Sequence, residues 1–182
     1  MSAYPIYTIE SAPEKSKPVL RQLQQAFGLI PNIAGAMAGS PVLISGFVGV
    51  FQQVHSGSFT EAEIQTLLLT NAVTNASTWA VAFHTALALK EGLDPSDVQA
   101  IRERRAPSDI KHAALSNMAR TLIEKRGRVD DQDIAMFTQA GFTRNTVLDV
   151  ILVVAASTIT NYTGSVTQPR LEAMFQEHAW KA

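Results

Sequence analysis

His84 lies among apolar residues in the middle of this 182-residue chain and is the side chain there best suited to move a proton. A histidine gains or loses its charge near neutral pH, so it can serve as an acid or as a base. Ser77, Ala80 and His84 stand at i, i+3 and i+7, a spacing that places all three on one face of a helix. We expect any chemistry to take place on that face.

Two helices joined by a short polar break must position this face. Thr60 and Glu63 form a capping-box pattern, and apolar residues at helical spacing follow it as far as Val73. The break at residues 75–78 is rich in Asn, Ser and Thr, which favour helix starts. A second helix is predicted from Thr78 to Glu91, with Gly92 at its end.

The remainder of the chain also shows helical rather than strand-like periodicity. No Gly- or Pro-rich linker separates two cores, so the sequence predicts one all-α domain over residues 1–182. Further helices are expected after Ser11 with Glu14 as a capping box, as a short helix between turns within residues 28–41, from Ser40-Pro41 to about His55, after Asp94, from Ser108 to Arg126, after Asp130, from Thr143 through Tyr162, and from Pro169 to His178.

The central stretch resembles the alkylhydroperoxidase D-like family, also called the carboxymuconolactone decarboxylase family. Its members carry a Glu on the first helix, C-x-x-C at the start of the second, and a His four residues after the second cysteine. In this chain the Glu corresponds to Gln65, the two cysteines to Ser77 and Ala80, and the histidine to His84. The segments LQQAFGLIPNIAGAMAGSP and VLDVILVVAASTITNYT extend the resemblance over about residues 19–180.

The resemblance implies a redox chemistry that this chain has lost. In the family the second cysteine attacks the peroxide, the first resolves the intermediate, and Glu and His relay the proton. This chain has 0 Cys, so no thiol–disulfide cycle can run within it. Ser77 offers a far more basic hydroxyl, Ala80 offers no reactive group, and Gln65 cannot accept a proton. We therefore expect no cysteine-dependent peroxidase activity.

Two functions from different classes stay open. In the first, the pocket binds a small molecule or performs a non-redox proton transfer of the decarboxylase or lactone type. His84 is then the candidate general acid or base, Ser77 and Gln65 assist it, and the substrate-binding candidates are Trp79, Ala80, Phe83 and Asn71. In the second, the protein is a non-catalytic helical oligomer that acts as a binding or scaffold protein, and His84 is a buried relic.

Composition and charge narrow the partners. The net charge of −1 gives no basic surface for nucleic acid. The run from Val150 to Ala156 is too short to span a bilayer and indicates a buried core helix, so no membrane association is expected. Residues 1–11 lack the pattern of a signal peptide, and together with the absence of cysteine this favours a cytoplasmic protein. The family assembles as dimers, trimers or hexamers, which implies a homo-oligomer here.

Metal and cofactor sites are not predicted. His55, His84, His112 and His178 are scattered and fit no zinc-binding spacing, so each outside the central stretch is interpreted as an isolated histidine. Glu61 and Glu63 are interpreted as capping residues in the first turn of the helix that follows Thr60. No G-x-S-x-G elbow or Gly-rich phosphate loop occurs.

Overall fold

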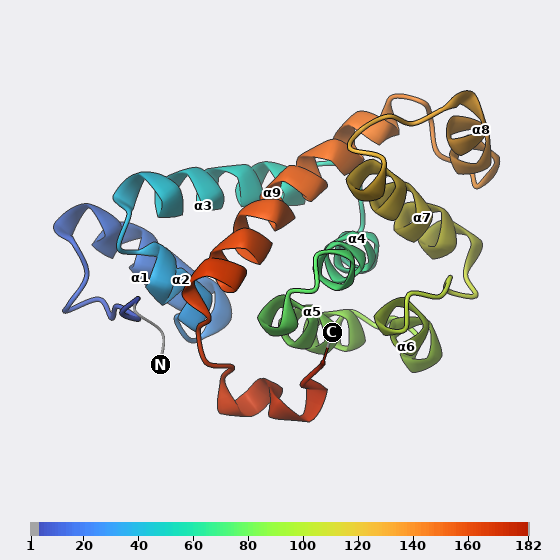
Figure 1. Cartoon of the computed structure of the whole chain (residues 1–182). Helices are drawn as coiled ribbons and strands as arrows, with labels where there is room; N and C mark the ends of the chain where they lie inside the picture. Colours follow the sequence, from blue (N-terminus) through green and yellow to red (C-terminus); the bar gives the residue numbers. More distant parts are fainter. Residues whose placement is uncertain (1–3, 182) are drawn as a thin grey trace.

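The computed structural model describes residues 4–181 and, within them, contains helices and no strand (Figure 1). This confirms the predicted all-α fold class. In chain order the elements are the 3₁₀ turn η1 (Glu14–Ser16), α1 (Lys17–Phe27), α2 (Asn32–Met37), α3 (Pro41–His55), α4 (Glu61–Thr74), α5 (Thr78–Lys90), α6 (Pro95–Arg102), α7 (Ile110–Glu124), α8 (Asp131–Gln139), α9 (Thr146–Thr167) and the 3₁₀ helix η2 (Ala173–His178).

Helix α4 forms the centre of the molecule. All residues from Ile64 to Val73 are buried, and the helix contacts α5, α6, α7 and α9 (Figure 1). Its start is the predicted capping box: Thr60 N donates to Glu63 Oε2 at 2.8 Å and Glu63 N donates to Thr60 Oγ1 at 3.2 Å. Because α4 is surrounded, residues on each of its faces are held in fixed contact with a different neighbour.

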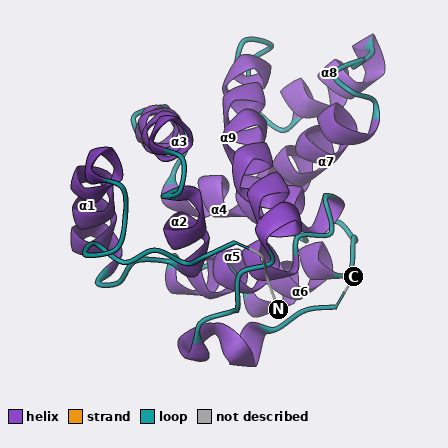
Figure 2. Ribbon diagram, turned by 60° about the vertical axis from the view of Figure 1, so that its left-hand side comes forward, coloured by secondary structure: helices purple, strands orange, loops and turns teal. Residues whose placement is uncertain are grey.

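Two groups of buried apolar side chains meet at α4. One group joins Leu69 and Val73 to side chains of α1, α2, α3 and α5. The other joins Ile64 and Leu67 to side chains of α7, α8 and α9. Figure 2 shows the same division in space, with α1 and α3 on one side of α9 and with α7 and α8 on the other. The site described below lies within the first group.

Helix α9 is the long apolar helix that the sequence predicts to be buried. Val150, Val153 and Ala156 do lie in the core, where α9 contacts α2, α3, α4, α5 and α7. Its opposite face, with Leu148 and Ile151, is exposed, so α9 is a core helix along one face. Within residues 4–181, α9 is also the one helix long and apolar enough to cross a membrane, and 39% of its most apolar stretch is buried.

Three predicted helix starts differ from the structure, and one of them is that of α9, which begins at Thr146 rather than at Thr143. The first helix begins at Lys17 after a 3₁₀ turn, and no capping box forms at Ser11, whose Oγ accepts from Thr8 N at 3.0 Å. Helix α7 begins after Asp109, because the Asp109 carboxylate accepts from His112 N at 2.9 Å and so caps the helix better than Ser108 does.

The C-terminal region differs more. Helix α9 continues past Tyr162 to Thr167, and Pro169 follows its end. The helix predicted from Pro169 to His178 is reduced to the short η2. Contacts with α2 and α5 help to hold this segment. Glu172 Oε1 accepts from Asn32 N at 2.6 Å, and Glu172 Oε2 accepts from Trp79 Nε1 at 2.9 Å.

Candidate active site

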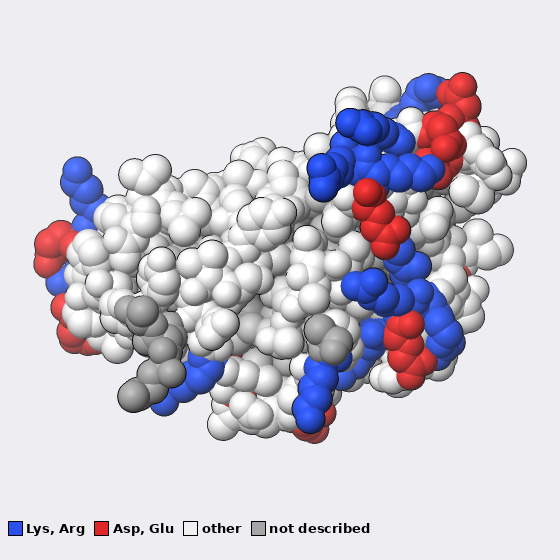
Figure 3. Space-filling view, in the orientation of Figure 1, with Lys and Arg blue, Asp and Glu red and all other residues white. Residues whose placement is uncertain are grey.

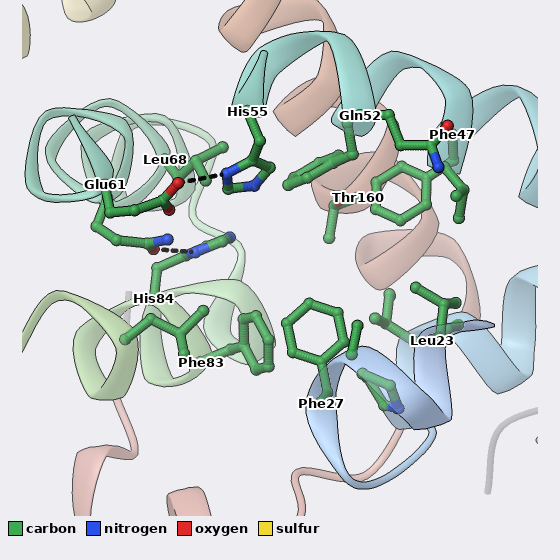
Figure 4. Close-up of a pocket in the computed structure, with 18 of the residues that line it drawn as sticks. Leu23, Phe27, Phe47, Gln52, His55, Glu61, Leu68, Phe83, His84 and Thr160 are labelled. Atoms are coloured by element: carbon green, nitrogen blue, oxygen red, sulfur yellow. Dashed lines mark hydrogen bonds and ion pairs between the residues drawn. The ribbon is translucent and has the colours of Figure 1, made fainter. Parts of the chain in front are cut away.

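A cavity of about 510 Å³ opens between α1, α2, α3, α4, α5 and α9. Its walls are mostly apolar, and aromatic rings from three helices supply much of them (Figure 4). The titratable side chains come from the end of α3, the start of α4 and α5, whereas Gln22 of α1 and Thr160 of α9 add polar groups elsewhere on the wall. The aromatic lining residues are Phe27, Phe47, Phe51, Trp79 and Phe83, and the titratable ones are His55, Glu61, His84, Lys90 and Glu91.

The aromatic wall is ordered by ring contacts. Phe83 stacks on Trp79 with centroids 4.9 Å apart and an interplanar angle of 18°, and the edge of Phe27 meets Phe83 at 6.0 Å. On the facing helix, Phe47 and Phe51 lie 4.7 Å apart. Offset and edge contacts of this kind fix ring orientation beyond simple burial. The cavity therefore has rigid walls suited to a flat or ring-shaped ligand.

His84 lies at the polar end, buried with 3% of its surface exposed. Its Nδ1 is 3.0 Å from Gln65 Oε1 (Figure 4). A carboxamide oxygen can only accept a hydrogen bond, so Nδ1 carries the proton and Nε2 carries a free lone pair. Burial, with a smaller contribution from His55, lowers the pKa of His84 from the ordinary 6.5 to about 3. His84 is therefore neutral at physiological pH and can accept a hydrogen bond from a ligand.

Four of the seven residues named from the sequence line this cavity: Gln65, Trp79, Phe83 and His84. Ala80, Ser77 and Asn71 do not line it. Ala80 is fully buried in the packing of α5. Asn71 faces away from the cavity, since it is six residues beyond Gln65 on α4, and its Nδ2 donates to Leu67 O at 2.8 Å while its Oδ1 has no partner.

The expectation that Ser77 shares a face with His84 was wrong. Ser77 is the N-cap of α5 and has an extended backbone, with φ −87° and ψ 92°, so its side chain departs from the helical phase. It borders a second, polar hollow of about 420 Å³ with Gly164, Ser165 and Gln168. A β-carbon on Gly164 would lie 3.4 Å from Ser77 Oγ, so the glycine allows α9 to approach this hydroxyl.

His55 and Glu61 are the cavity residues that the sequence alone does not reveal. Sequence spacing presents His55 as isolated and Glu61 as a first-turn residue, yet His55 Nδ1 lies 2.9 Å from Glu61 Oε1 and both side chains line the cavity. Glu63, and not Glu61, forms the capping box with Thr60. One signal is present in the sequence: Glu61 stands four residues before Gln65, which places both on the same face of α4.

The described residues offer no metal centre. Within residues 4–181, no group of three or more His, Asp or Glu side chains is arranged to hold a metal ion. The polar end of the cavity contains two histidines and one carboxylate, which lie in two separate pairs. These side chains can form hydrogen bonds to a ligand and exchange protons with it.

The chain has the alkylhydroperoxidase D-like fold. It is similar to an uncharacterized peroxidase-related protein from Ralstonia eutropha JMP134, described as an alkylhydroperoxidase AhpD core, with a TM-score of 0.83 and 18% identity over 96% of this chain and 94% of the other. It is also similar to a peroxidase-related protein from Silicibacter sp. TM1040, with a TM-score of 0.79 and 18% identity over 95% and 92% of the two chains.

A third similar structure is a Cys→Ala variant of the debrominase Bmp8 in complex with 2,3,4-tribromopyrrole. Its TM-score is 0.80, and the identity is 14% over 98% of this chain and 97% of that one. Comparison with protein-family models and with curated proteins gives no match. Identities this low establish the fold, and the functional argument has to come from the site.

Proposed function

We propose that this protein binds a small, largely apolar molecule in the cavity and that any reaction there is a non-redox proton transfer rather than thiol chemistry. The single observation behind the proposal is the aromatic-walled cavity of about 510 Å³ with the neutral His84 at its polar end. Pockets that bind small molecules are typically apolar with few, well-placed polar groups. The chain has 0 Cys, so the thiol route is closed.

The shape of the ligand follows from the walls. Phe27, Phe83 and Trp79 present flat faces and edges to the cavity, and these pack best against a ring. Bmp8, which shares this fold, is described in complex with a halogenated pyrrole, a ring compound. Because Nε2 of His84 accepts a hydrogen bond, the preferred ligand carries an O–H or N–H donor.

A matched pair of ligands tests this binding mode. Phenol and toluene have similar shapes, and phenol alone can donate a hydrogen bond. We expect calorimetry to detect binding of both, and the preference for phenol relative to toluene should fall about 3–10-fold in His84→Phe, the loss of one neutral hydrogen bond. An unchanged preference would mean that His84 does not contact the ligand.

Blocking the cavity supplies the second half of the test. Ala26 lines the cavity on α1, whereas Gln25, one residue earlier, is exposed and does not line it. Ala26→Phe should weaken the binding of both ligands, and Gln25→Phe should leave it at the wild-type level. Equal binding by the two variants, or none by the wild type, would instead favour the non-catalytic scaffold.

The scaffold function also has a structural basis. Helix α9 exposes an apolar stripe formed by Leu148, Ile151, Tyr162 and Val166. Exposed apolar patches on soluble proteins commonly mark interaction sites. Assembly of identical copies through this stripe is compatible with ligand binding, because the stripe and the cavity lie on different surfaces of α9: Thr160, which lines the cavity, is buried.

A further inference from the structure

A histidine–carboxylate pair occupies the mouth of the cavity. His55 is the last residue of α3 and Glu61 the first residue of α4, and their Nδ1 and Oε1 atoms are 2.9 Å apart. The side chains are 39% and 49% exposed, so both reach water as well as the cavity. Since Glu63 satisfies the capping box, Glu61 is free to support His55.

The second pair lies one helical turn further along α4. Glu61 and Gln65 are separated by four residues, and each contacts a histidine from a flanking helix, His55 of α3 and His84 of α5 (Figure 4). An ionised carboxylate, like a carboxamide oxygen, only accepts hydrogen bonds, so each histidine is protonated at Nδ1 and keeps a lone pair at Nε2. In Figure 4 the second ring nitrogen of each histidine is directed away from its partner, toward the cavity.

The two pairs differ in the α4 side chain that bonds the imidazole, which is a carboxylate in Glu61 and a carboxamide in Gln65. This difference separates their roles. Glu61 can balance the charge of an imidazolium, and partial exposure gives the proton a route to water. Gln65 carries no charge, and His84 is buried with its pKa lowered to about 3, so His84 stays neutral. Of the two, His55 is the one with a carboxylate beside it and access to water.

We infer that His55 is a general base acting on the cavity ligand, that Glu61 positions and supports it, and that His84 holds the ligand by a hydrogen bond to its neutral Nε2. This inference rests on the proposed binding of a small molecule in the cavity. The substrate class is a ring-sized, largely apolar compound with an acidic C–H or O–H, and the reaction class is a proton-transfer isomerisation or elimination. His55 Nε2 receives the proton, the electron pair stays on the ligand, and the proton leaves to water or returns at another atom.

A carbon acid with a coloured product can report this base directly. The probe is 5-nitrobenzisoxazole, a flat, uncharged ring compound. When a base removes its ring proton, the C–H electron pair forms the C≡N bond and the N–O bond breaks, which releases a nitrophenolate. The reaction needs no oxidant, reductant or metal, and absorbance of the product gives its rate.

His55→Ala should lower kcat/KM for this probe about 100-fold, the usual contribution of a positioned general base. Free imidazole in the buffer should restore part of the rate in that variant, because it can occupy the space left by the side chain. The control is His112→Ala, which removes a histidine of α7 that does not line the cavity and should leave the rate unchanged.

Glu61→Gln tests the supporting role. The amide still accepts the hydrogen bond from Nδ1 but cannot balance a positive charge. We expect kcat to fall and KM to stay close to the wild-type value, whereas a merely structural loss would change both. The other charged or titratable groups that line this end are His84, Lys90 and Glu91, all at or beside α5. Lys90→Met removes one charge there and so measures how far a change of charge in the cavity alters the rate without any loss of His55 or Glu61.

The outcomes separate this inference from the proposed function. If phenol binds but His55→Ala keeps the wild-type rate with the probe, or imidazole fails to rescue it, the base assignment is wrong and ligand binding stands. If neither phenol nor the probe binds, both proposals fail together. A rate in the wild type no faster than that of free imidazole at equal concentration also overturns the base assignment.

Discussion

The two histidines of the cavity show how the hydrogen-bond partner of an imidazole decides whether a positive charge on the ring is compensated. His84 donates to an uncharged Gln65 and is buried, so its hydrogen-bond partner cannot compensate a positive charge. His55 faces Glu61 and remains partly exposed. The two histidines therefore differ in two ways: the partly exposed His55 has a carboxylate of α4 as its partner, and the buried His84 has a carboxamide.

The buried neutral state of His84 predicts a loss of stability in acid. Its pKa falls from 6.5 to about 3 on folding, so between these values the unfolded chain binds a proton that the folded chain does not. Above pH 6.5 this effect does not reduce the free energy of unfolding, and the reduction grows as the pH falls from 6.5 toward 3. Between pH 7 and pH 4 the free energy of unfolding should fall by about 3 kcal/mol, because one proton bound only by the unfolded chain costs about 1.4 kcal/mol per pH unit.

Urea unfolding at pH 7 and pH 4 measures this effect. We expect His84→Gln, which cannot titrate, to lose about 3 kcal/mol less than the wild type over the same interval. The quantity to compare is the change in the free energy of unfolding between pH 7 and pH 4, because the substitution also changes packing at both pH values. His112→Gln gives the effect of replacing a histidine outside the cavity. Parallel losses in the wild type and in His84→Gln would show that His84 is not held neutral.

The absence of thiols predicts that the protein does not reduce peroxides by a dithiol cycle. The wild type should consume no peroxide with a dithiol reductant above the rate without protein. A variant with Gln65→Glu, Ser77→Cys and Ala80→Cys replaces all three missing parts of the relay. Activity in the variant alone would show that the scaffold still supports the chemistry. Peroxide consumption by the wild type that His84→Ala abolishes would contradict the prediction.

At this scale the sequence predicted part of the site. Gln65 and His84 could be paired because each lies at a regular helical position that a resemblance had marked. The partnership of His55 with Glu61 depends on how α3 turns into α4, which helical spacing does not encode. Ser77 was misplaced because an N-cap residue leaves the helical phase. The roles of the predicted site residues remain predictions.

At the scale of elements, the sequence predicted the start of a helix correctly where residues next to that start form the cap. The capping boxes that start α4 and α8 use side chains within three residues of the N-cap. The C-terminal segment could not be predicted in this way, since its conformation depends on distant partners. Arg102 Nη1 donates to His178 O at 3.1 Å, and Glu172 contacts α2 and α5, contacts that only the folded chain supplies.

Glu172 is predicted to hold the C-terminal segment against α2 and α5. Its carboxylate accepts from Asn32 N and Trp79 Nε1, so Glu172→Ala leaves two donors without a protein partner. We expect a loss of about 1–3 kcal/mol in the free energy of unfolding. Trypsin should also cleave after Arg170 faster in the variant, because the segment that follows is released.

Glu177→Ala is the matched control, since Glu177 lies on the same segment, is exposed, and pairs only with the neighbouring His178 at 3.5 Å. It should keep the stability and the cleavage rate of the wild type. Because Trp79 also forms the cavity wall, the Glu172 variant should bind phenol more weakly as well. Wild-type behaviour of Glu172→Ala in all three measurements would mean that the segment is held without this carboxylate.

At the scale of the whole molecule, charge is unevenly distributed. Figure 3 shows most charged side chains at the end that carries α6, α7 and α8 and a smaller group at the opposite end, beside α1, while the surface over α3 and α9 is nearly uncharged. The stripe of α9 adds exposed apolar side chains, because Leu148, Tyr162 and Val166 are 65%, 62% and 62% exposed. On α3, Val42 is 84% exposed. The residue spacing keeps the α9 side chains on one face of the helix.

Such a surface predicts self-association through α9. A glutamate placed in a buried apolar interface loses its hydration without gaining a partner, so Ile151→Glu should separate the copies. Analytical ultracentrifugation should show an oligomer for the wild type and a smaller species for the variant. The control is Met136→Glu on α8, because Met136 and Ile151 are equally exposed, at 44% and 45%, but Met136 lies away from the stripe. Dissociation by both variants would point to a different interface, and a monomeric wild type would leave α9 without a role in assembly.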